Sequence, residues 1–377
     1  MTSRERMLAL LKGQPTDRIG IQIRGVCPWH EPWCRAKHAS FAPLIEAVRA
    51  HGDWQAMHGF DSGFCSSSAP LSMRTTVQDV PDHPDVEHHV TVIDGPRGPL
   101  RQVVARSRVG HPPMTVEHYC KTPDDAENVL ALPYAPLAPD VTPFLELDRH
   151  IGPRGLVLVI IGSDPIGEVH GLLGTETLAF WSREQRPLLH RLMAEFLRRL
   201  LDIIKSFDRA RLASKMPLWI GHTGAEIVVP PLHSPADFRD FVVRYDTPLH
   251  QAIHAIGGLV HVHCHGSISK LLEDFADMGV DELHPVEAPP LGDTPLAEAK
   301  RRIGHRLTIE GNVEISRVLD EQSAAFRRRI EQTVADGKPG GRFAICPTAS
   351  PYPVELSPRA VTNYLTLIDV AREQGRY

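Results

Sequence analysis

The chain has 377 residues, 42% hydrophobic and 23% charged, and its 41 Lys and Arg against 46 Asp and Glu give a net charge of −5. These values exclude a disordered or collagen-like chain, and the absence of a strongly basic balance argues against binding to nucleic acid. The sequence has neither a signal-peptide core nor an apolar run of about 18 residues. Its six cysteines are too sparse for a disulfide framework. We expect a cytoplasmic protein with free thiols and no membrane segment.

The first predicted elements are helices over residues 3–12, with Ser3 as the N-cap, and over 41–52. Between them, Arg24 ends what reads as the first strand. The pattern then changes over 64–120 to short alternating pieces at 86–93 and 101–108, separated by the turn-rich DGPRGP. Alternation around such a turn predicts a β-hairpin-like insertion.

From residue 122 onward, short apolar runs alternate with longer amphipathic segments. The run 155–162 (GLVLVIIG) has the length and the β-branched residues of a buried parallel strand. Five more strands are predicted, each after a helix: 218–221 after 184–206, 258–264 after 235–256, 280–286 after 267–278, 306–311 after 294–303, and 342–346 after 315–336. A helix over 358–374 closes the chain. This alternation predicts an α/β fold, a distorted (β/α)8 TIM-type barrel forming a single domain over 1–377, with an N-terminal helical extension.

Reactive residues of such barrels come from the C-terminal ends of the strands and the loops that follow them. Here nearly every predicted strand exit carries polar or metal-capable side chains: Asp164, Glu168 and His170; His222 and Glu226; His261, His263, Cys264 and His265; Glu287; Asn312 and Glu314; and Cys346. This concentration is the strongest functional signal in the sequence.

The segment HVHCHG predicts a metal site. Side chains alternate along a strand, so its histidines face one side and Cys264 faces the other. Zinc takes nitrogen and sulfur donors, and a catalytic zinc site keeps one position open. We predict zinc ligation by His263, His265 and Cys346, with Cys264 as an alternative ligand if a bulge turns it inward. The alternative interpretation is that these histidines form hydrogen-bonded polar layers inside the barrel.

Six further residues are assigned by type and position. Glu226 and His222 are candidate proton carriers, although a solvent-exposed carboxylate is an equally good interpretation of Glu226. Arg24 is suited to a substrate carboxylate, and Trp29 to an aromatic wall of the substrate site. The remaining predicted substrate-binding residues are Glu168 and Asn312.

Four stretches together resemble the uroporphyrinogen decarboxylase superfamily. They are TSRERMLALLKGQPTDRIGI, HYCKTPDDAENVLAL, PPLHSPADFRDFVVRYDTPLHQAIHAIGGLVHVHCHG and LGDTPLAEAKRRIGHRLTIEGNVE, and the resemblance covers most of the chain except about 64–110. It implies a distorted (β/α)8 barrel with its active site at the strand C-terminal ends. True decarboxylases carry Arg-Gln-Ala-Gly-Arg-Tyr after the first strand, where this chain reads RGVCPWHEPW and only Arg24 is comparable. The resemblance therefore favours the branch of methyltransferases that exchange methyl groups with a corrinoid protein.

That branch binds zinc through His-x-Cys-Gly at a strand end and a distant Cys. The matching stretch here is His263-Cys264-His265-Gly266, with His265 where the family has Cys, and Cys346 lies close to the distant position. The resemblance implies Zn²⁺, a corrinoid (cobalamin) carried by a partner protein, and a small methylated substrate, such as a methoxylated aromatic that is O-demethylated. The alternatives are a metal-independent decarboxylase of a polycarboxylated substrate and a non-catalytic tetrapyrrole- or corrinoid-binding barrel. A homodimer is a further possibility.

Overall fold

The computed structural model describes residues 1–64 and 66–377, so the expected free thiol of Cys65 lies outside the described residues. The other five cysteines are free. The chain divides into two compact units. Unit 1 consists of Met1–Phe60, Asp140–Gly162 and Phe207–Tyr377, and unit 2 of Asp61–Pro139 and Ser163–Ser206. The single domain over 1–377 stays a prediction.

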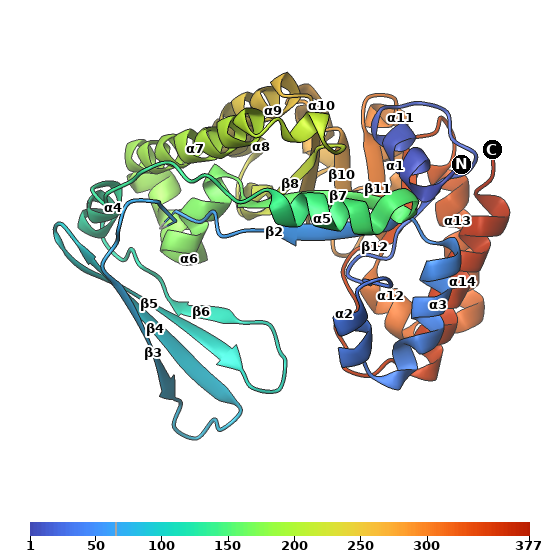
Figure 1. Ribbon diagram of the computed structural model, residues 1–377, viewed down its shortest axis with the longest axis horizontal. Helices are drawn as coiled ribbons and strands as arrows, with labels where there is room; N and C mark the ends of the chain where they lie inside the picture. The colour runs from blue at the N-terminus through green and yellow to red at the C-terminus, as the bar shows by residue number, and fades with distance from the viewer. Residues whose placement is uncertain (65) are drawn as a thin grey trace. The chain divides into compact units, whose positions relative to one another are not determined.

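Unit 1 is built on an eight-stranded parallel sheet in the order β1-β12-β11-β10-β9-β8-β7-β2 (Figure 1). The strands are β1 (Gly20–Ile21), β2 (Trp54–Gly59), β7 (Gly155–Ser163), β8 (Trp219–Thr223), β9 (Leu259–Cys264), β10 (Glu282–Pro285), β11 (Thr308–Val313) and β12 (Phe343–Pro347). Asp53 joins the two ends of the sheet: its N–H donates to the Ile21 carbonyl (2.7 Å), and its carboxylate accepts from the Ile21 N–H (2.9 Å). The predicted TIM-type α/β fold is confirmed, with β2 as a strand that the sequence analysis missed.

Most helices of unit 1 follow its strands in the chain, as in other α/β barrels, whereas α1 precedes β1. The helices of unit 1 are α1 (Ser3–Leu11), α2 (Glu31–Ala36), α3 (Ala42–His51), α5 (Thr142–Ile151), α8 (Pro235–Phe238), α9 (Arg244–Ala255), α10 (Leu272–Asp277), α11 (Leu296–Ile303), α12 (Ile315–Asp320), α13 (Ser323–Gly337) and α14 (Pro358–Gln374). The predicted helix 235–256 is interrupted by a π-helical segment, Arg239–Val243, and 315–336 is split into α12 and α13. No helix in the described residues has the length and apolar character needed to span a membrane.

The first helix, α1, packs against the N-terminal end of the barrel. Its N-cap is Thr2 rather than the predicted Ser3, because the Thr2 hydroxyl accepts from the Glu5 N–H and the Glu5 carboxylate accepts from the Thr2 N–H, which forms a capping box. Apolar side chains of α1 pack against residues at the starts of the strands, in a cluster of Met7, Leu11, Leu156, Leu158 and Trp219. The barrel interior is therefore apolar where it packs against α1.

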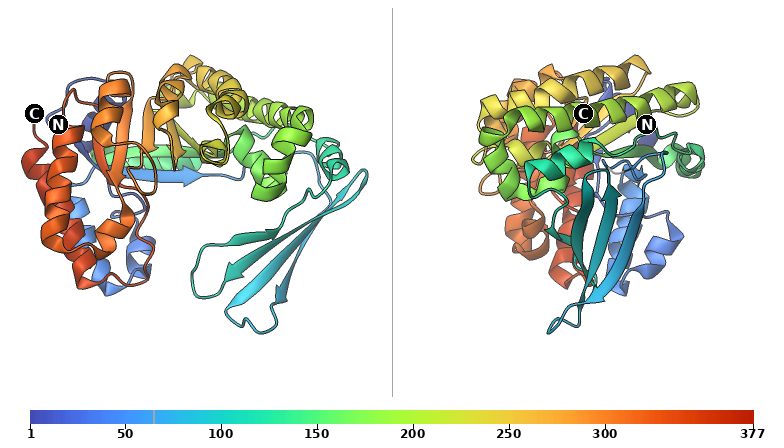
Figure 2. Two further views of the ribbon diagram at one scale, coloured as in Figure 1. Left: turned by 180° about the vertical axis from the view of Figure 1, so that it is seen from behind. Right: turned by 90° about the vertical axis from the view of Figure 1, so that its left-hand side faces the viewer.

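Unit 2 contains the predicted insertion as a four-stranded antiparallel sheet in the order β3-β4-β5-β6 (Figure 2). Its elements are β3 (Met73–Asp79), β4 (Val86–Gly95), β5 (Gly98–Ser107), β6 (Met114–Glu117), α4 (Pro123–Leu130), α6 (Pro165–Glu184) and α7 (Arg186–Arg209). The predicted hairpin is confirmed as β4 and β5. The sequence analysis did not predict α6, which bends at Gly174, a residue with φ of 77°.

Candidate active site

A cavity of about 490 Å³ lies at the C-terminal ends of the unit 1 strands, lined by residues that follow β8 to β12. Its polar wall comes from the segments after β8, β9, β10 and β12: Glu226, His265, Gly266, Glu287 and Thr348. This end of a (β/α) barrel is where such enzymes hold their substrates. We call this cavity the rim cavity.

Two carboxyl groups of the rim cavity have opposite electrostatic surroundings. Burial opposes ionisation of Glu287, but hydrogen bonds from His265 Nδ1 (2.9 Å) and the Gly266 N–H (2.9 Å) leave its pKa below the ordinary value. Burial raises the pKa of Glu226, even though its carboxylate accepts the Gly224 N–H at 3.0 Å. One group is thus held as a carboxylate, while the other retains a proton to higher pH, which suits a general acid.

A buried polar network fills the barrel interior. Arg24 Nη1 lies 3.5 Å from Glu310 Oε2 and 3.3 Å from His261 Nε2. Because guanidinium groups only donate, His261 Nε2 must accept, so its Nδ1 carries the proton and donates to Glu282 Oε2 at 2.9 Å. Gln55 Nε2 donates to Glu310 Oε2 at 3.4 Å. Burial and the nearby Glu310 raise the pKa of Glu282 well above its ordinary value.

Three neighbouring strands place a mixed donor set in this network. His284 on β10, Glu310 on β11 and Cys346 on β12 are fully buried and offer N, O and S atoms that all lie within 4.8 Å of one another. Glu310 Oε1 has no hydrogen-bond partner among the described residues. Burial, and then the charge of Glu310, raise the pKa of the Cys346 thiol. Nitrogen, carboxylate and sulfur are the ligand types that zinc takes in proteins.

His263 connects this donor set to the rim cavity. Its Nδ1 lies 2.8 Å from His284 Nδ1, and its ring centroid is 4.6 Å from that of His265. His284 Nε2 faces the Pro347 carbonyl at 3.3 Å and must donate to it, so neutral His284 accepts at Nδ1 and His263 donates there. The Nε2 atom of His263 therefore keeps its lone pair, and burial lowers the pKa of His263 to about 2.

The family model for uroporphyrinogen decarboxylase (URO-D) matches residues 181–371, half of the chain. The chain belongs to the uroporphyrinogen decarboxylase family. A methyltransferase from Methanosarcina mazei has the same fold at 16% identity, with a TM-score of 0.62 over 99% of each chain. A 3-keto-D-glucoside 4-epimerase from E. coli matches at 14% identity over 66% of this chain and 93% of that chain, with a TM-score of 0.36. No curated protein matches the chain.

In this URO-D family member, the three predicted zinc ligands are not all neighbours. Cys346 belongs to the donor set, His263 contacts its member His284, and His265 is on the rim with Glu287. Cys264 alternates with the two interior histidines of β9 and is fully buried on the outer side of the strand.

The other predicted site residues do not line the rim cavity. His222 faces outward from β8 and contacts α9. Asn312 pairs with Cys346 across β11 and β12 and lines an adjoining cavity, which shares Glu287, Leu291 and Thr348 with the rim cavity. The guanidinium carbon of Arg154 lies over the ring of Trp29, 4.4 Å from the centroid of that ring. Glu168 lies in unit 2, where its carboxylate accepts the Phe64 N–H at 2.9 Å.

Sequence reasoning missed Glu282, His284, Glu310 and Gln55, because it considered strand ends rather than strand interiors. A signal was present in the short strands ELHP and TIEGNV, where charged or imidazole side chains interrupt apolar runs. In the observed register Glu282 pairs with His261, and His284 pairs with His263. Such pairs share a sheet face, so the polar layers emerge once the register is known.

Proposed function

We propose that this URO-D family protein is a zinc-dependent methyltransferase that moves a methyl group between a small methylated substrate and a corrinoid carried by a partner protein. The observation that carries the proposal is the donor set of His284, Glu310 and Cys346, which His263 links to the rim cavity. The methyltransferase from Methanosarcina mazei shares the fold over 99% of both chains, which supports the proposal. We propose methoxylated aromatics as the substrates and O-demethylation as the reaction.

The interior residues fit a zinc ion. The donor set combines an imidazole, a carboxylate and a thiol, and the Oε1 atom of Glu310 has no partner among the described residues. We therefore place Zn²⁺ on His284, Glu310 and Cys346, where it would take the Nδ1 lone pair of His284 that accepts from His263 in this structure. When bound, zinc supplies Lewis-acid activation of a substrate oxygen.

The rim residues have separate tasks in this proposal. A cavity of about 490 Å³ accommodates a small substrate. Burial raises the pKa of Glu226, which favours its protonated form, and in this proposal Glu226 delivers a proton to the leaving oxygen. Glu287 holds His265 through the 2.9 Å contact with its Nδ1, which fixes the orientation of this ring at the cavity wall.

Arg24 favours methyl transfer over decarboxylation of a polycarboxylate. A decarboxylase of this kind needs a cation that meets a substrate carboxylate. Here the Arg24 side chain is already engaged in the interior with Glu310, Gln55 and His261. We therefore propose that Arg24 balances the charge of Glu310 in the interior network rather than meeting a substrate carboxylate.

The test is a methyl-transfer assay that follows the visible absorbance of cob(I)alamin and methylcob(III)alamin with a panel of methoxylated aromatics. We expect turnover by the wild type and a loss of roughly 100-fold or more in Cys346→Ser, since a ligand matters at least as much as its outer hydrogen-bond partners. Cys264→Ser is the matched control, because that buried cysteine lies on the outer side of β9. Full activity in Cys346→Ser contradicts the zinc mechanism, and corrinoid binding without any turnover supports a non-catalytic barrel instead.

A further inference from the structure

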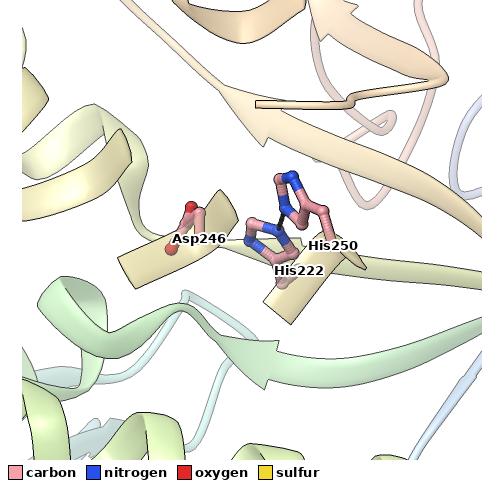
Figure 3. A group of neighbouring side chains, drawn as sticks. All are labelled: His222, Asp246 and His250. Carbon is pink, nitrogen blue, oxygen red and sulfur yellow. Dashed lines mark hydrogen bonds between the residues drawn. The ribbon is translucent and has the colours of Figure 1, made fainter. Parts of the chain in front are cut away.

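A second group of metal-capable side chains lies outside the barrel interior. His222 on β8 and the pair Asp246 and His250 on α9 are all buried, at 1% exposure or less. Each offers a ligand atom, and these atoms all lie within 4.8 Å of one another. Figure 3 shows the two imidazoles facing each other, with the carboxylate of Asp246 beside them.

The local structure explains why these three residues meet. A Cβ on Gly221 would contact the interior residues Leu158, Ile160 and His261, so its neighbour His222 faces outward. Asp246 and His250 are four residues apart on α9, which places them on one face of the helix. The strand β8 thus supplies one donor, and the helix α9 supplies two, to the same buried cluster.

The hydrogen bonds determine where the lone pairs lie. His250 Nδ1 is 2.9 Å from the Met278 carbonyl and must donate to it, which leaves a lone pair on Nε2. His222 Nε2 lies 2.8 Å away and therefore donates to that lone pair. The second nitrogen of His222, Nδ1, then also carries a lone pair, and it has no hydrogen-bond partner among the described residues.

This arrangement is rich in acceptors. Burial lowers the pKa of His222 to about 4, so this ring is neutral at pH 7. The two neutral imidazoles share a single proton, and the Nδ1 lone pair of His222 is left over. A divalent cation stabilises such a group of lone pairs, and the Met278 carbonyl orients His250 as outer hydrogen-bond partners do in metal sites.

We infer that His222, Asp246 and His250 bind a divalent metal ion such as Zn²⁺ in a buried site that ties β8 to α9. Two imidazoles and one carboxylate are a common zinc donor set. The site is separate from the proposed catalytic donor set, with which it shares no residue.

The test is metal analysis in the Cys346→Ser background, in which the catalytic metal is removed. We expect about one equivalent of zinc per chain, and none after Asp246→Asn or His250→Gln is added. His254→Gln is the matched control, because His254 lies one turn further along α9, partly exposed and hydrogen-bonded to Asp281 at 2.8 Å. This control retains the metal. A metal-free Cys346→Ser protein whose Tm does not rise with added Zn²⁺, or a folded Asp246→Asn variant that keeps its metal, overturns the inference.

X-ray absorption at the zinc edge of Cys346→Ser protein covers the case in which the ligand variants do not fold. We expect a shell of two imidazole nitrogens with oxygens, and a sulfur-containing shell or a shell without imidazole overturns the inference. A failure of the proposed catalytic zinc site would be seen differently: wild type and Cys346→Ser would contain equal amounts of metal.

Discussion

Glu168 in unit 2 should make the stability of the protein depend on pH. Its side chain lines a cavity of about 310 Å³ together with Asp61 and Tyr119. Burial raises the pKa of Glu168 to about 7, against the opposing effect of the Phe64 N–H, and the charge of Asp61 adds to the increase. The charged form of this carboxyl group is therefore disfavoured in the folded protein.

The sign and size of the effect follow from the pKa values of the two states. Below pH 4.5, the ordinary pKa of glutamate, Glu168 is protonated in both the folded and the unfolded protein. Between pH 4.5 and about 7, Glu168 ionises in the unfolded chain but not in the folded protein, so the free energy of unfolding falls as pH rises. The difference between the pKa values of Glu168 in the unfolded and the folded protein corresponds to about 3 kcal/mol of unfolding free energy, at 1.36 kcal/mol per pKa unit. Glu168→Gln keeps an acceptor for the Phe64 N–H but does not titrate. The free energy of unfolding of the wild type, relative to this variant, should decrease by about 3 kcal/mol from pH 4.5 to pH 7.

Urea denaturation followed by circular dichroism, repeated at half-unit steps of pH, measures this difference. Subtracting the variant from the wild type cancels the titration of the other groups. Glu176→Gln is the control, because Glu176 is an exposed glutamate on the same helix, α6. A wild-type-minus-variant difference that is flat with pH, or that grows as pH rises, refutes the reasoning.

Two further substitutions test the barrel closure and the rim. Asp53→Asn should destabilise the protein by about 3 kcal/mol or more in the same urea assay, because it leaves Arg6 and Arg18 without their buried carboxylate partner. Asp17→Asn is the control, because it also removes a carboxylate partner of Arg6, but the Asp17 side chain is 42% exposed. This variant should lose no more than about 1 kcal/mol of unfolding free energy. Equal losses in the two variants would contradict the importance of burial. Glu226→Gln should lower kcat by roughly 100-fold or more and abolish the decline of activity at high pH, and an unchanged pH–rate profile would remove Glu226 from the proposed proton transfer.

The sequence predicted the strands of unit 1 well wherever they are apolar and β-branched. The run 155–162 lies within β7, and 342–346 nearly coincides with β12. The strand β2 (WQAMHG) was missed because half of its side chains are at least partly exposed and its pattern has no apolar run. The break between α12 and α13 was missed because the amphipathic pattern continues across it.

The candidate site was predicted less completely, because its composition depends on strand register. Alternation along β9 correctly placed His263 inward and Cys264 outward. It could not reveal that His284 and Glu310 lie beside Cys346, since these neighbours come from different strands. His222 points outward because its neighbour Gly221 faces the barrel interior. The position of His222 near the end of a strand does not by itself reveal this direction.

The central claim is that Cys346, Glu310 and His284 hold a zinc ion. The most direct measurement is the zinc content per chain of purified wild type, Cys346→Ser and Cys264→Ser, determined side by side by mass spectrometry. We expect Cys346→Ser to contain about one zinc fewer than wild type, and Cys264→Ser to match wild type. Equal zinc contents in wild type and Cys346→Ser would contradict the claim.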